Sequence, residues 1–313
     1  MTKANATIKY AALLWLKRCK LDGLERATIR SYKGHFMHHI GPKIGGLLLE
    51  EFTAADVQDF IDEMLEENSR AMTKKVLTSL RSILSTAQSR GMIDKNVARE
   101  IKLRRASRND KERIIPTKDE IRLLIDKAPP REKPLVITAI LTGMRSSELR
   151  GLSWAHVDFT KGLIHIKQRA DRYNAIGVPK SRAGIRTIPM SPLVASTLKD
   201  WKARCPKGEL NLVFPNGAGN VEGHANIYHR IFKPLMIACE NVDSDGKLKF
   251  GFHSLRHAAA SLFIEQGWTP KKIQVLLGHS SINMTFDVYG HLFHNPEEDI
   301  AQMAKMESDL LAT

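Results

Sequence analysis

The sequence predicts a mainly α-helical protein of two domains with one small antiparallel β-sheet. The chain has 313 residues, and a domain commonly holds about 150. Apolar residues recur at helical spacing through most of the sequence, whereas three short β-branched segments lie close together between residues 163 and 190. Residues 102–113 contain six basic residues and no large aliphatic one except Leu103, so we expect a linker there, between domains at residues 1–101 and 114–313.

Four helical segments fill the first hundred residues. In the first, residues 8–19, six apolar side chains follow the i, i+3, i+4 spacing of one buried stripe. In the third, Asp56 stands three residues after Thr53, which is the spacing of a capping box. Hydroxyl residues stand at the starts of all four segments, and these are Thr7, Thr28, Thr53 and Ser69. The first domain is therefore expected to be a small four-helix unit.

The balance of charge indicates nucleic acid as the partner. Lys and Arg number 48 against 34 Asp and Glu, a formal net charge of +14, and the excess is spread along the whole chain. Such a field attracts polyanions. An anionic membrane surface is the alternative, but the sequence has neither a Lys-rich amphipathic anchor nor a long apolar span. We therefore expect double-stranded DNA as a partner, no membrane, and a cytoplasmic location.

Basic side chains of the first domain and the linker are candidates for contact with DNA phosphates. On the fourth helix these are Lys74, Lys75 and Arg81, and in the linker they are Arg104, Arg105 and Arg108. A run of charges is also compatible with plain solvated surface, and composition alone leaves both interpretations open. A basic linker between two basic domains could close around a duplex.

The second domain is expected to begin with helices, pass through the sheet and return to helices. Thr117 with Glu120 opens one helix in capping-box spacing, and residues 132–142 form an apolar helix that ends at Gly143. The predicted strands are residues 163–168, 175–179 and 185–190. The later helices are expected at residues 226–239, 254–266, 270–277 and 282–288, with a terminal helix at 297–311.

Three clusters hold the residues that could carry chemistry, and the first is LTGMRSSELRGLSW. It places Arg145 in the turn between Gly143, at a helix end, and Ser146 or Ser147, at a helix start. A guanidinium in such a turn can clamp two phosphate oxygens beside free helix N–H groups. Glu148 could hold that arginine or a nearby histidine in place. An ordinary surface pair of arginine and glutamate fits the same residues.

The second cluster, HSLRH, combines an arginine with two histidines. His253 and Arg256 are three residues apart on one helix face, so a second phosphate-binding arginine comes with a titratable partner. His253 and His257 are four apart, which raises a metal site, but the glutamate of the HExxH zinc motif is absent and the three cysteines form no CxxC pair. We therefore expect no metal, and we expect His257 to be a packed, hydrogen-bonded helix residue.

The third cluster, LGHSSINMTFDVYGH, contains a tyrosine close to its end. Leu277 and Gly278 end a helix, His279 lies in the turn, and Tyr289 ends the next short helix. A phenol, with an ordinary pKa of about 10, is a poor nucleophile unless cationic neighbours or a base assist it. Most tyrosines are core or interface aromatics, so spacing by itself does not single out this one.

Together the three clusters resemble the catalytic motifs of the tyrosine recombinase (phage integrase) family in type, order and approximate separation. The resemblance covers residues 112–295 closely, whereas the first domain is similar to the family's SAM-like core-binding domain in general pattern only. It implies an active site of Arg145, His253, Arg256 and His279, with Tyr289 as the nucleophile. Glu148 would be the supporting acid. PKSRAGIRTIP resembles the family's β-hairpin, often written TKTxxSxRxIP, so Lys180 would be the catalytic lysine.

The resemblance implies a site-specific recombinase or integrase that cleaves and rejoins DNA through a 3′-phosphotyrosyl intermediate, for integration or resolution. The two arginines and His279 would neutralise the phosphoryl oxygens, His253 would accept or donate a proton near the tyrosine, and Lys180 would protonate the departing 5′ oxygen. No ATP, metal or other cofactor would be needed, in agreement with the absence of a GxxxxGK[ST] loop.

The family also implies an assembly on DNA. Its members act as tetramers, sometimes with accessory proteins, and the terminal helix at residues 297–311 would then dock on a neighbouring protomer. Its apolar stripe must be buried somewhere, and folding back onto its own domain is the alternative.

Two functions from other classes stay open at this point. A non-catalytic DNA-binding regulator is suggested by residues 261–280, where helix, Gly-containing turn and helix follow one another as in helix-turn-helix proteins. A type IB topoisomerase, which the family resembles chemically, would relax DNA without exchanging partners. The regulator leaves Arg145, His253 and Tyr289 unexplained.

Overall fold

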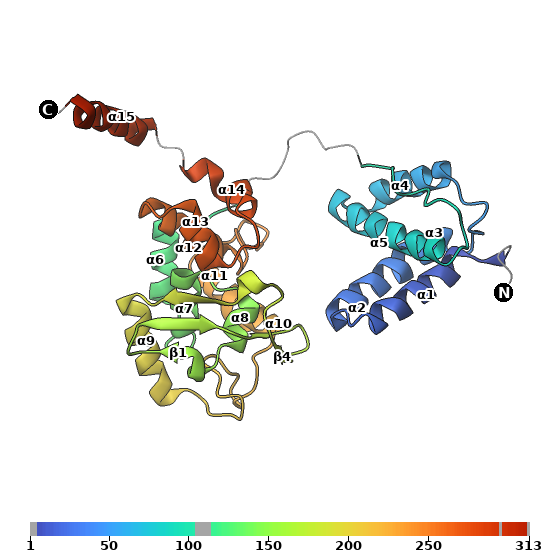
Figure 1. Cartoon of the computed structure of the whole chain (residues 1–313). Coiled ribbons are helices and arrows are strands. Elements are labelled where there is room, and N and C mark those ends of the chain that lie inside the picture. The colour runs from blue at the N-terminus through green and yellow to red at the C-terminus, as the bar shows by residue number, and fades with distance from the viewer. Residues whose placement is uncertain (1–4, 104–113, 294–295, 312–313) are drawn as a thin grey trace. The chain divides into compact units, whose positions relative to one another are not determined.

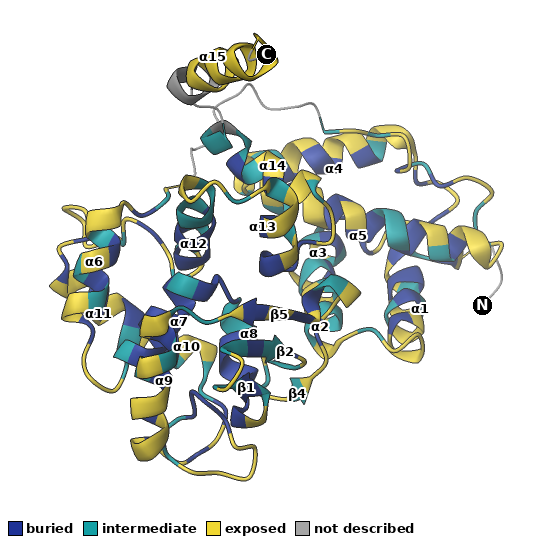
Figure 2. Ribbon diagram, turned by 60° about the vertical axis from the view of Figure 1, so that its left-hand side comes forward, coloured by how far each residue is buried: buried dark blue, intermediate teal, exposed yellow. Residues whose placement is uncertain are grey.

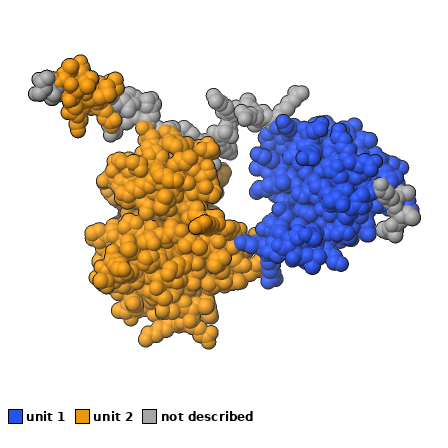
Figure 3. All heavy atoms as spheres, in the orientation of Figure 1, with its two compact units in different colours: residues 1–110 blue, residues 111–313 orange. Residues whose placement is uncertain are grey.

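The computed structural model describes residues 5–103, 114–293 and 296–311. The chain divides into two compact units, residues 1–110 and residues 111–313 (Figure 3). The change from one unit to the other falls inside the predicted linker, residues 102–113, of which all but residues 102 and 103 lie outside the described residues. No helix among the described residues is both long enough and apolar enough to span a membrane.

Unit 1 is built from helices (Figure 1). They are α1 (Ile8–Leu21), α2 (Arg26–His35), the π-helical turn η2 (Phe36–Ile40), α3 (Gly41–Ile44), α4 (Ala54–Glu67) and α5 (Arg70–Ser89). The four predicted helices are confirmed as α1, α2, α4 and α5, while η2 and α3 continue the second one further than its apolar spacing indicates.

Local hydrogen bonds start α1, α4 and α5 where the sequence predicts, at Thr7, Thr53 and Ser69. The expected start of the second helix at Thr28 is wrong, because α2 already begins at Arg26 and no side chain caps it. Thr7 Oγ1 accepts from the backbone N–H of Tyr10 at 3.3 Å, and Thr53 with Asp56 forms both halves of a capping box. The apolar stripes then meet in one core, whose largest fully buried side chains are Ile8, Ile40, Met64, Leu77, Leu80, Ile83 and Leu84. Burying each such side chain stabilises the fold by about 1.5–3 kcal/mol.

Unit 2 combines helices with short strands. Its helices are α6 (Lys118–Lys127), α7 (Lys133–Thr142), α8 (Ser146–Gly151), α9 (Pro192–Arg204), α10 (His224–Asn226), α11 (Lys233–Ala238), α12 (Ser254–Glu265), α13 (Pro270–Leu277), α14 (Asn283–Tyr289) and α15 (Pro296–Leu311), with short turns η3 (Trp154–His156), η4 (Arg182–Gly184), η5 (Ile227–Phe232) and η6 (Gly290–Phe293). α9 is not among the helices predicted from the sequence, although Ser191 caps it and Pro192 occupies its first turn.

The predicted strands are present, in two antiparallel sheets rather than one. β1 (Val157–Asp158), β2 (Leu163–Ile166) and β5 (Arg186–Pro189) form a three-stranded sheet with β2 in the centre. β3 (Arg169–Ala170) and β4 (Ile176–Gly177) form a two-stranded one. In the register of β2 with β5, Ile164 faces Ile188 and Ile166 faces Arg186, so an arginine shares the buried side of the strand with an isoleucine.

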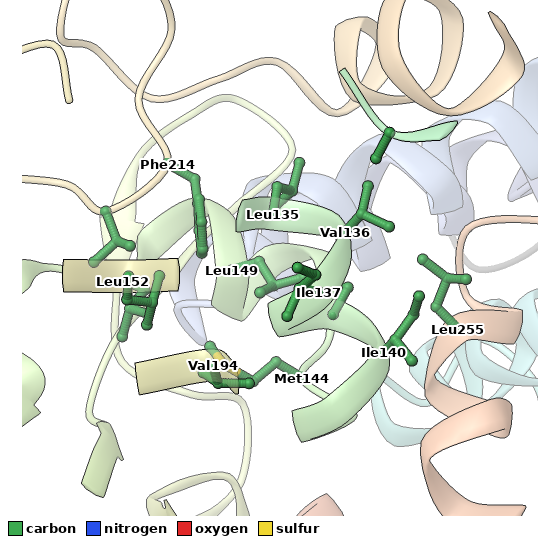
Figure 4. Close-up of a cluster of buried hydrophobic side chains, with 14 of the residues drawn as sticks. Leu135, Val136, Ile137, Ile140, Met144, Leu149, Leu152, Val194, Phe214 and Leu255 are labelled. Carbon is green, nitrogen blue, oxygen red and sulfur yellow. The ribbon is translucent and has the colours of Figure 1, made fainter. Parts of the chain in front are cut away.

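The core of unit 2 forms around α7, which is buried on nearly all sides. Leu135, Val136, Ile137 and Ile140 of this helix contact side chains from α8, α9 and α12 (Figure 4). A helix that is hydrophobic all round belongs inside a domain. Because α7 ends at Gly143, just before Arg145, this core fixes the position of the first cluster.

The terminal helix α15 differs from the rest of unit 2. Every residue from 300 to 311 is exposed (Figure 2), including Ile300, Met303, Met306 and Leu310 of the predicted stripe. The expected helix is therefore confirmed, and its apolar stripe is not buried against any of the residues that the structure describes.

Candidate active site

Glu148 connects Arg145 to a second arginine that sequence analysis did not select. Its carboxylate accepts from Arg145 twice, from the backbone N–H at 2.8 Å and from Nη1 at 2.9 Å. It also accepts from Nη1 and Nη2 of Arg186, each at 2.9 Å, in a bidentate pair whose side chains are both 3% exposed. Burial alone would raise the pKa of Glu148, but the hydrogen bonds and charge of Arg186 lower it. The carboxylate is therefore ionised and holds both guanidinium groups.

Three long-range hydrogen bonds, one from Arg145 and two from Arg256, join the three clusters. Arg145 Nη2 donates to the carbonyl of Gly278 at 2.9 Å, across 133 residues. Arg256 donates from Nη1 to the carbonyl of Gly143 at 2.7 Å and from Nη2 to that of Leu277 at 2.6 Å. Each arginine is thus anchored on the backbone of another cluster, at the ends of α7 and α13.

The two anchoring glycines are required by backbone geometry. Gly143 and Gly278 end α7 and α13 with φ of 63° and 66°, a left-handed conformation that glycine adopts without a steric penalty. A Cβ at Gly143 would lie 2.6 Å from Leu277 Cδ2, and one at Gly278 would lie 2.8 Å from the carbonyl oxygen of Ala183. The chain can therefore bring the arginines and these turns together only because both positions lack a side chain.

Arg256 is the most deeply buried cation of the site. It is 3% exposed, and burial followed by the positive charge of Arg145 lowers its pKa to about 9. It is still protonated at neutral pH. Because water is excluded there, its charge acts on a neighbouring anion through a low dielectric. Arg145 is 33% exposed at its side chain, so of these two arginines it is the one that solvent reaches.

His279 follows α13 and is 7% exposed. Its Nδ1 lies 2.9 Å from Oγ1 of the buried Thr285. Burial, and then the positive charges of Arg256 and Arg145, lower the pKa of His279 to about 3. The imidazole is therefore neutral at neutral pH. If Thr285 donates to Nδ1, the ring proton is on Nε2, which can donate to an anion.

Tyr289 ends α14 and is 1% exposed. Its Oη lies 2.6 Å from Nδ1 of His257, and the two ring centroids are 5.6 Å apart. His253 lies edge-on to His257, with centroids 5.2 Å apart and planes at 89°. The prediction that His257 is packed and hydrogen-bonded is confirmed, and its partner is the predicted nucleophile itself.

Electrostatic interactions connect several of the predicted residues. Beyond the effect of burial, the charges of Arg145, Glu148 and Tyr289 shift the pKa of Arg256, and those of Arg256, Arg145 and His257 shift the pKa of His279. α12, α13 and α14, which carry or precede these residues, pack together in sequence order (Figure 1).

Lys180 lies in the segment between β4 and β5 and is exposed. The return of this segment is fixed beside the site. A Cβ on Gly184 would lie 2.6 Å from Cβ of Pro179, and the carbonyl of Gly184 accepts from Arg186 Nη1 at 3.1 Å. The glycine at position 184, where the family pattern has a serine, thus lets Pro179 pack directly against the backbone of that position.

The candidate DNA-contacting residues have different surroundings. Lys74 and Lys75 are exposed on α5. Arg81 is half-buried, and it donates to the carbonyls of Ala98, at 3.0 Å, and Ile101. Its guanidinium therefore holds the segment that leaves unit 1. The linker residues Arg104, Arg105 and Arg108 lie outside the described residues.

Three residues of the site were missed by sequence reasoning: Arg186, Thr285 and, in its contact with tyrosine, His257. A signal for Arg186 is present, because period-two alternation in β5 puts it on the same face as Ile188. Thr285 stands four residues before Tyr289, on one face of α14. Within the described residues, no group of three or more His, Cys, Asp or Glu side chains is arranged to hold a metal ion.

Comparison with known protein families gives two matches. The model described as "Phage integrase family" matches residues 107–295, and the one described as "Phage integrase, N-terminal SAM-like domain" matches residues 7–65. The first covers more than half of the chain and includes all three clusters.

Individual relatives agree with these matches. A tyrosine recombinase XerC-like protein of Caldanaerobacter subterraneus is 25% identical over 309 residues, covering 89% of this chain and 77% of that protein. The structure of the Tn1549 transposon integrase in complex with a circular intermediate DNA aligns with a TM-score of 0.80 at 21% identity, covering 95% of this chain and 99% of that one. A lambda integrase tetramer bound to a Holliday junction aligns with a TM-score of 0.67 at 18% identity, covering 88% and 78%.

Proposed function

The chain belongs to the phage integrase family of tyrosine recombinases, and from that premise we propose that Tyr289 cleaves DNA by attacking a backbone phosphate. The product is a 3′-phosphotyrosyl link and a free 5′ hydroxyl. The observation that supports this best is the pair of crossed anchors, Arg145 on the carbonyl of Gly278 and Arg256 on that of Gly143. They support the proposal because they bring together two cations, from distant parts of the sequence, that can neutralise one phosphate.

Each chemical need of the exchange has a residue. Arg145 and Arg256 neutralise the non-bridging oxygens, and neutral His279 adds a hydrogen-bond donor. Lys180 protonates the departing 5′ oxygen, and His253 belongs to the proton-exchanging group near the tyrosine. The phosphotyrosine conserves the bond energy, so that a 5′ hydroxyl of another strand can reverse the step. The proposed chemistry uses no metal ion, because the arginines neutralise the phosphate. It uses no ATP, because the phosphotyrosine keeps the energy of the broken bond.

The proposed partner is duplex DNA, bound by a homotetramer during strand exchange. The basic charge of the chain and the likeness to the lambda integrase tetramer on a Holliday junction support this. The exposed stripe of α15 supplies a surface for contact between protomers.

The test starts by selecting bound sequences from a pool of random duplexes. A selected duplex is nicked near the cleavage position, so that the short fragment with the new 5′ hydroxyl diffuses away after cleavage. This duplex should trap a covalent protein–DNA adduct. Tyr289→Phe should bind this duplex with unchanged affinity and form no adduct; an adduct in that variant would refute the assignment. A chelator should leave adduct formation unchanged, and loss of cleavage that added divalent metal restores would revive a metal site.

Two further assays separate the recombinase from the functions of other classes. Exchange between two selected sites is expected alongside any plasmid relaxation. Relaxation without exchange would instead indicate a topoisomerase, and binding without an adduct would indicate a regulator.

A further inference from the structure

The geometry points to His257 as the catalytic base of Tyr289. The family resemblance implies a proton-exchanging role for His253 and no catalytic role for His257. Its Nδ1 lies 2.6 Å from the phenolic oxygen, which is hydrogen-bond distance from the atom that would attack phosphorus. The inference rests on the proposed function of Tyr289 and deepens it by naming where the phenolic proton goes.

The phenol needs an acceptor because water cannot reach it. Tyr289 is 1% exposed and packs with Ala260, Ile273 and Leu277. An ordinary phenol, with a pKa of about 10, loses its proton rarely at neutral pH without a base nearby. A buried hydroxyl must therefore pass its proton to a group of the protein.

The other polar groups around the site are unsuited to that task. Arg145 and Arg256 are cations without a lone pair to offer. His279 has its Nδ1 on Thr285 and stands among positive charges that oppose a further proton. His257 presents an imidazole nitrogen to the hydroxyl itself, and the edge-on ring of His253 packs against it.

The step balances in protons and bonds. As Tyr289 Oη bonds to phosphorus, its proton moves to Nδ1 of a neutral His257, which becomes an imidazolium. The bond between phosphorus and the 5′ oxygen breaks, and that oxygen takes a proton from the ammonium of Lys180. In the rejoining step the 5′ hydroxyl attacks, its proton returns to Lys180, and the phenolate leaving group regains its proton from His257.

Single-turnover cleavage of the selected nicked duplex tests this. His257→Ala and His257→Asn should each slow adduct formation by about 10²- to 10⁴-fold, the usual contribution of a general base. Asn places an oxygen near the position of Nδ1, so it keeps a hydrogen-bond acceptor but cannot take up a proton. Added imidazole should partly restore cleavage by His257→Ala. His229→Asn is the matched control, since His229 is an exposed histidine packed edge-on to Tyr228 in η5, with centroids 5.0 Å apart.

A second substrate separates the two ends of the proton transfer. When the 5′-bridging oxygen is replaced by sulfur, the leaving group departs without a proton. The defect of the two His257 variants should persist on this substrate, because they fail at the nucleophile.

Two results would overturn the inference while leaving the proposed function intact: a wild-type rate in His257→Asn, or rescue of the His257 variants by the sulfur substrate. Failure of the proposed function would look different, since the wild-type protein would then form no adduct through Tyr289. DNA affinity and thermal melting, matched to wild type in His257→Asn, exclude a folding defect as the cause.

Discussion

Glu148 binds Arg186 through two parallel hydrogen bonds of 2.9 Å, and both side chains are almost completely buried. Arg186 also donates from Nε to the carbonyl of Leu276, at 2.6 Å, near the end of α13. One ion pair therefore connects the helix that follows Arg145, the strand β5 and the turn that carries His279. The orientation of the proposed phosphate-binding groups depends on a residue pair that itself need not touch DNA.

We predict that Glu148→Gln destabilises the protein by about 3–5 kcal/mol, because it leaves the Arg186 cation buried without its counter-charge. Urea unfolding measures the change. Glu265→Gln is the control: its partner Lys118 is 53% exposed, and Glu265 itself is 41% exposed, so its loss should cost at most about 1 kcal/mol. Equal losses of unfolding free energy in the two variants would show that the buried ion pair stabilises the protein no more than an exposed one.

We predict an acid-sensitive stability that depends on His279. Its pKa is about 3 in the folded protein, against 6.5 for a free histidine. Above pH 6.5 the histidine is neutral in both states and adds no pH dependence. Below pH 6.5 only the unfolded state takes up the proton, so stability should fall by up to about 1.4 kcal/mol per pH unit as the pH drops toward 3.

Unfolding free energies between pH 7 and pH 4 measure this slope. His279→Asn should flatten it, whereas His229→Asn should not. An identical slope in wild type and His279→Asn would contradict the prediction.

We predict that Gly278→Ala impairs cleavage as well as stability. Gly278 and Gly267 both have left-handed backbones, with φ of 66° and 69°. A Cβ on Gly267 meets nothing within 4 Å, whereas one on Gly278 would lie 2.8 Å from a backbone oxygen. Gly267→Ala should therefore lower the free energy of unfolding only by the strain of a left-handed alanine, about 1–2 kcal/mol, and adduct formation should be unchanged. Gly278→Ala should cost more and displace the carbonyl that holds Arg145; a wild-type rate of adduct formation would argue against that anchor.

We predict that the linker arginines contribute to the salt dependence of DNA binding. Each phosphate contact contributes a slope of about −0.9 in log K against log salt concentration. Changing Arg104, Arg105 and Arg108 to Gln should flatten the slope by up to about three units while leaving site preference largely unchanged. Lys43→Gln serves as the control, since Glu63 and Glu67 already bind that ammonium. An unchanged slope in the triple variant would mean that the linker only connects the domains.

We predict that α15 acts between protomers. A chain ending at Pro296 should bind a single site normally but lose cooperative assembly and recombination, because the exposed stripe has no other place of burial among the described residues. Met303→Gln with Leu310→Gln in the full chain should reproduce the loss, while Lys305→Gln with Glu307→Gln should not. Normal recombination by the truncated chain would eliminate this role. The measurement is native gel analysis of complexes with one-site and two-site DNA.

The sequence alone determined the local structure and the type of chemistry. Capping by Thr53 with Asp56, and the left-handed glycine after α7, depend on residues within a few positions of one another. Such interactions can be read along the chain. The order of Arg145, the HSLRH segment and Tyr289 likewise led to the family assignment, because residue types and their separations can be compared between sequences without a structure.

Only the tertiary structure decided which side chains meet. Hydrogen bonds such as that of Arg145 with Gly278 join residues 133 positions apart. They exist because α7, α12 and α13 pack around one core, and helical periodicity does not reveal which faces come together. For the same reason His257 could be recognised as packed but not as the partner of Tyr289, 32 positions later. Likewise Arg186 could be placed on the buried face of a strand, whereas its pairing with Glu148 follows from the way β5 meets α8 in space.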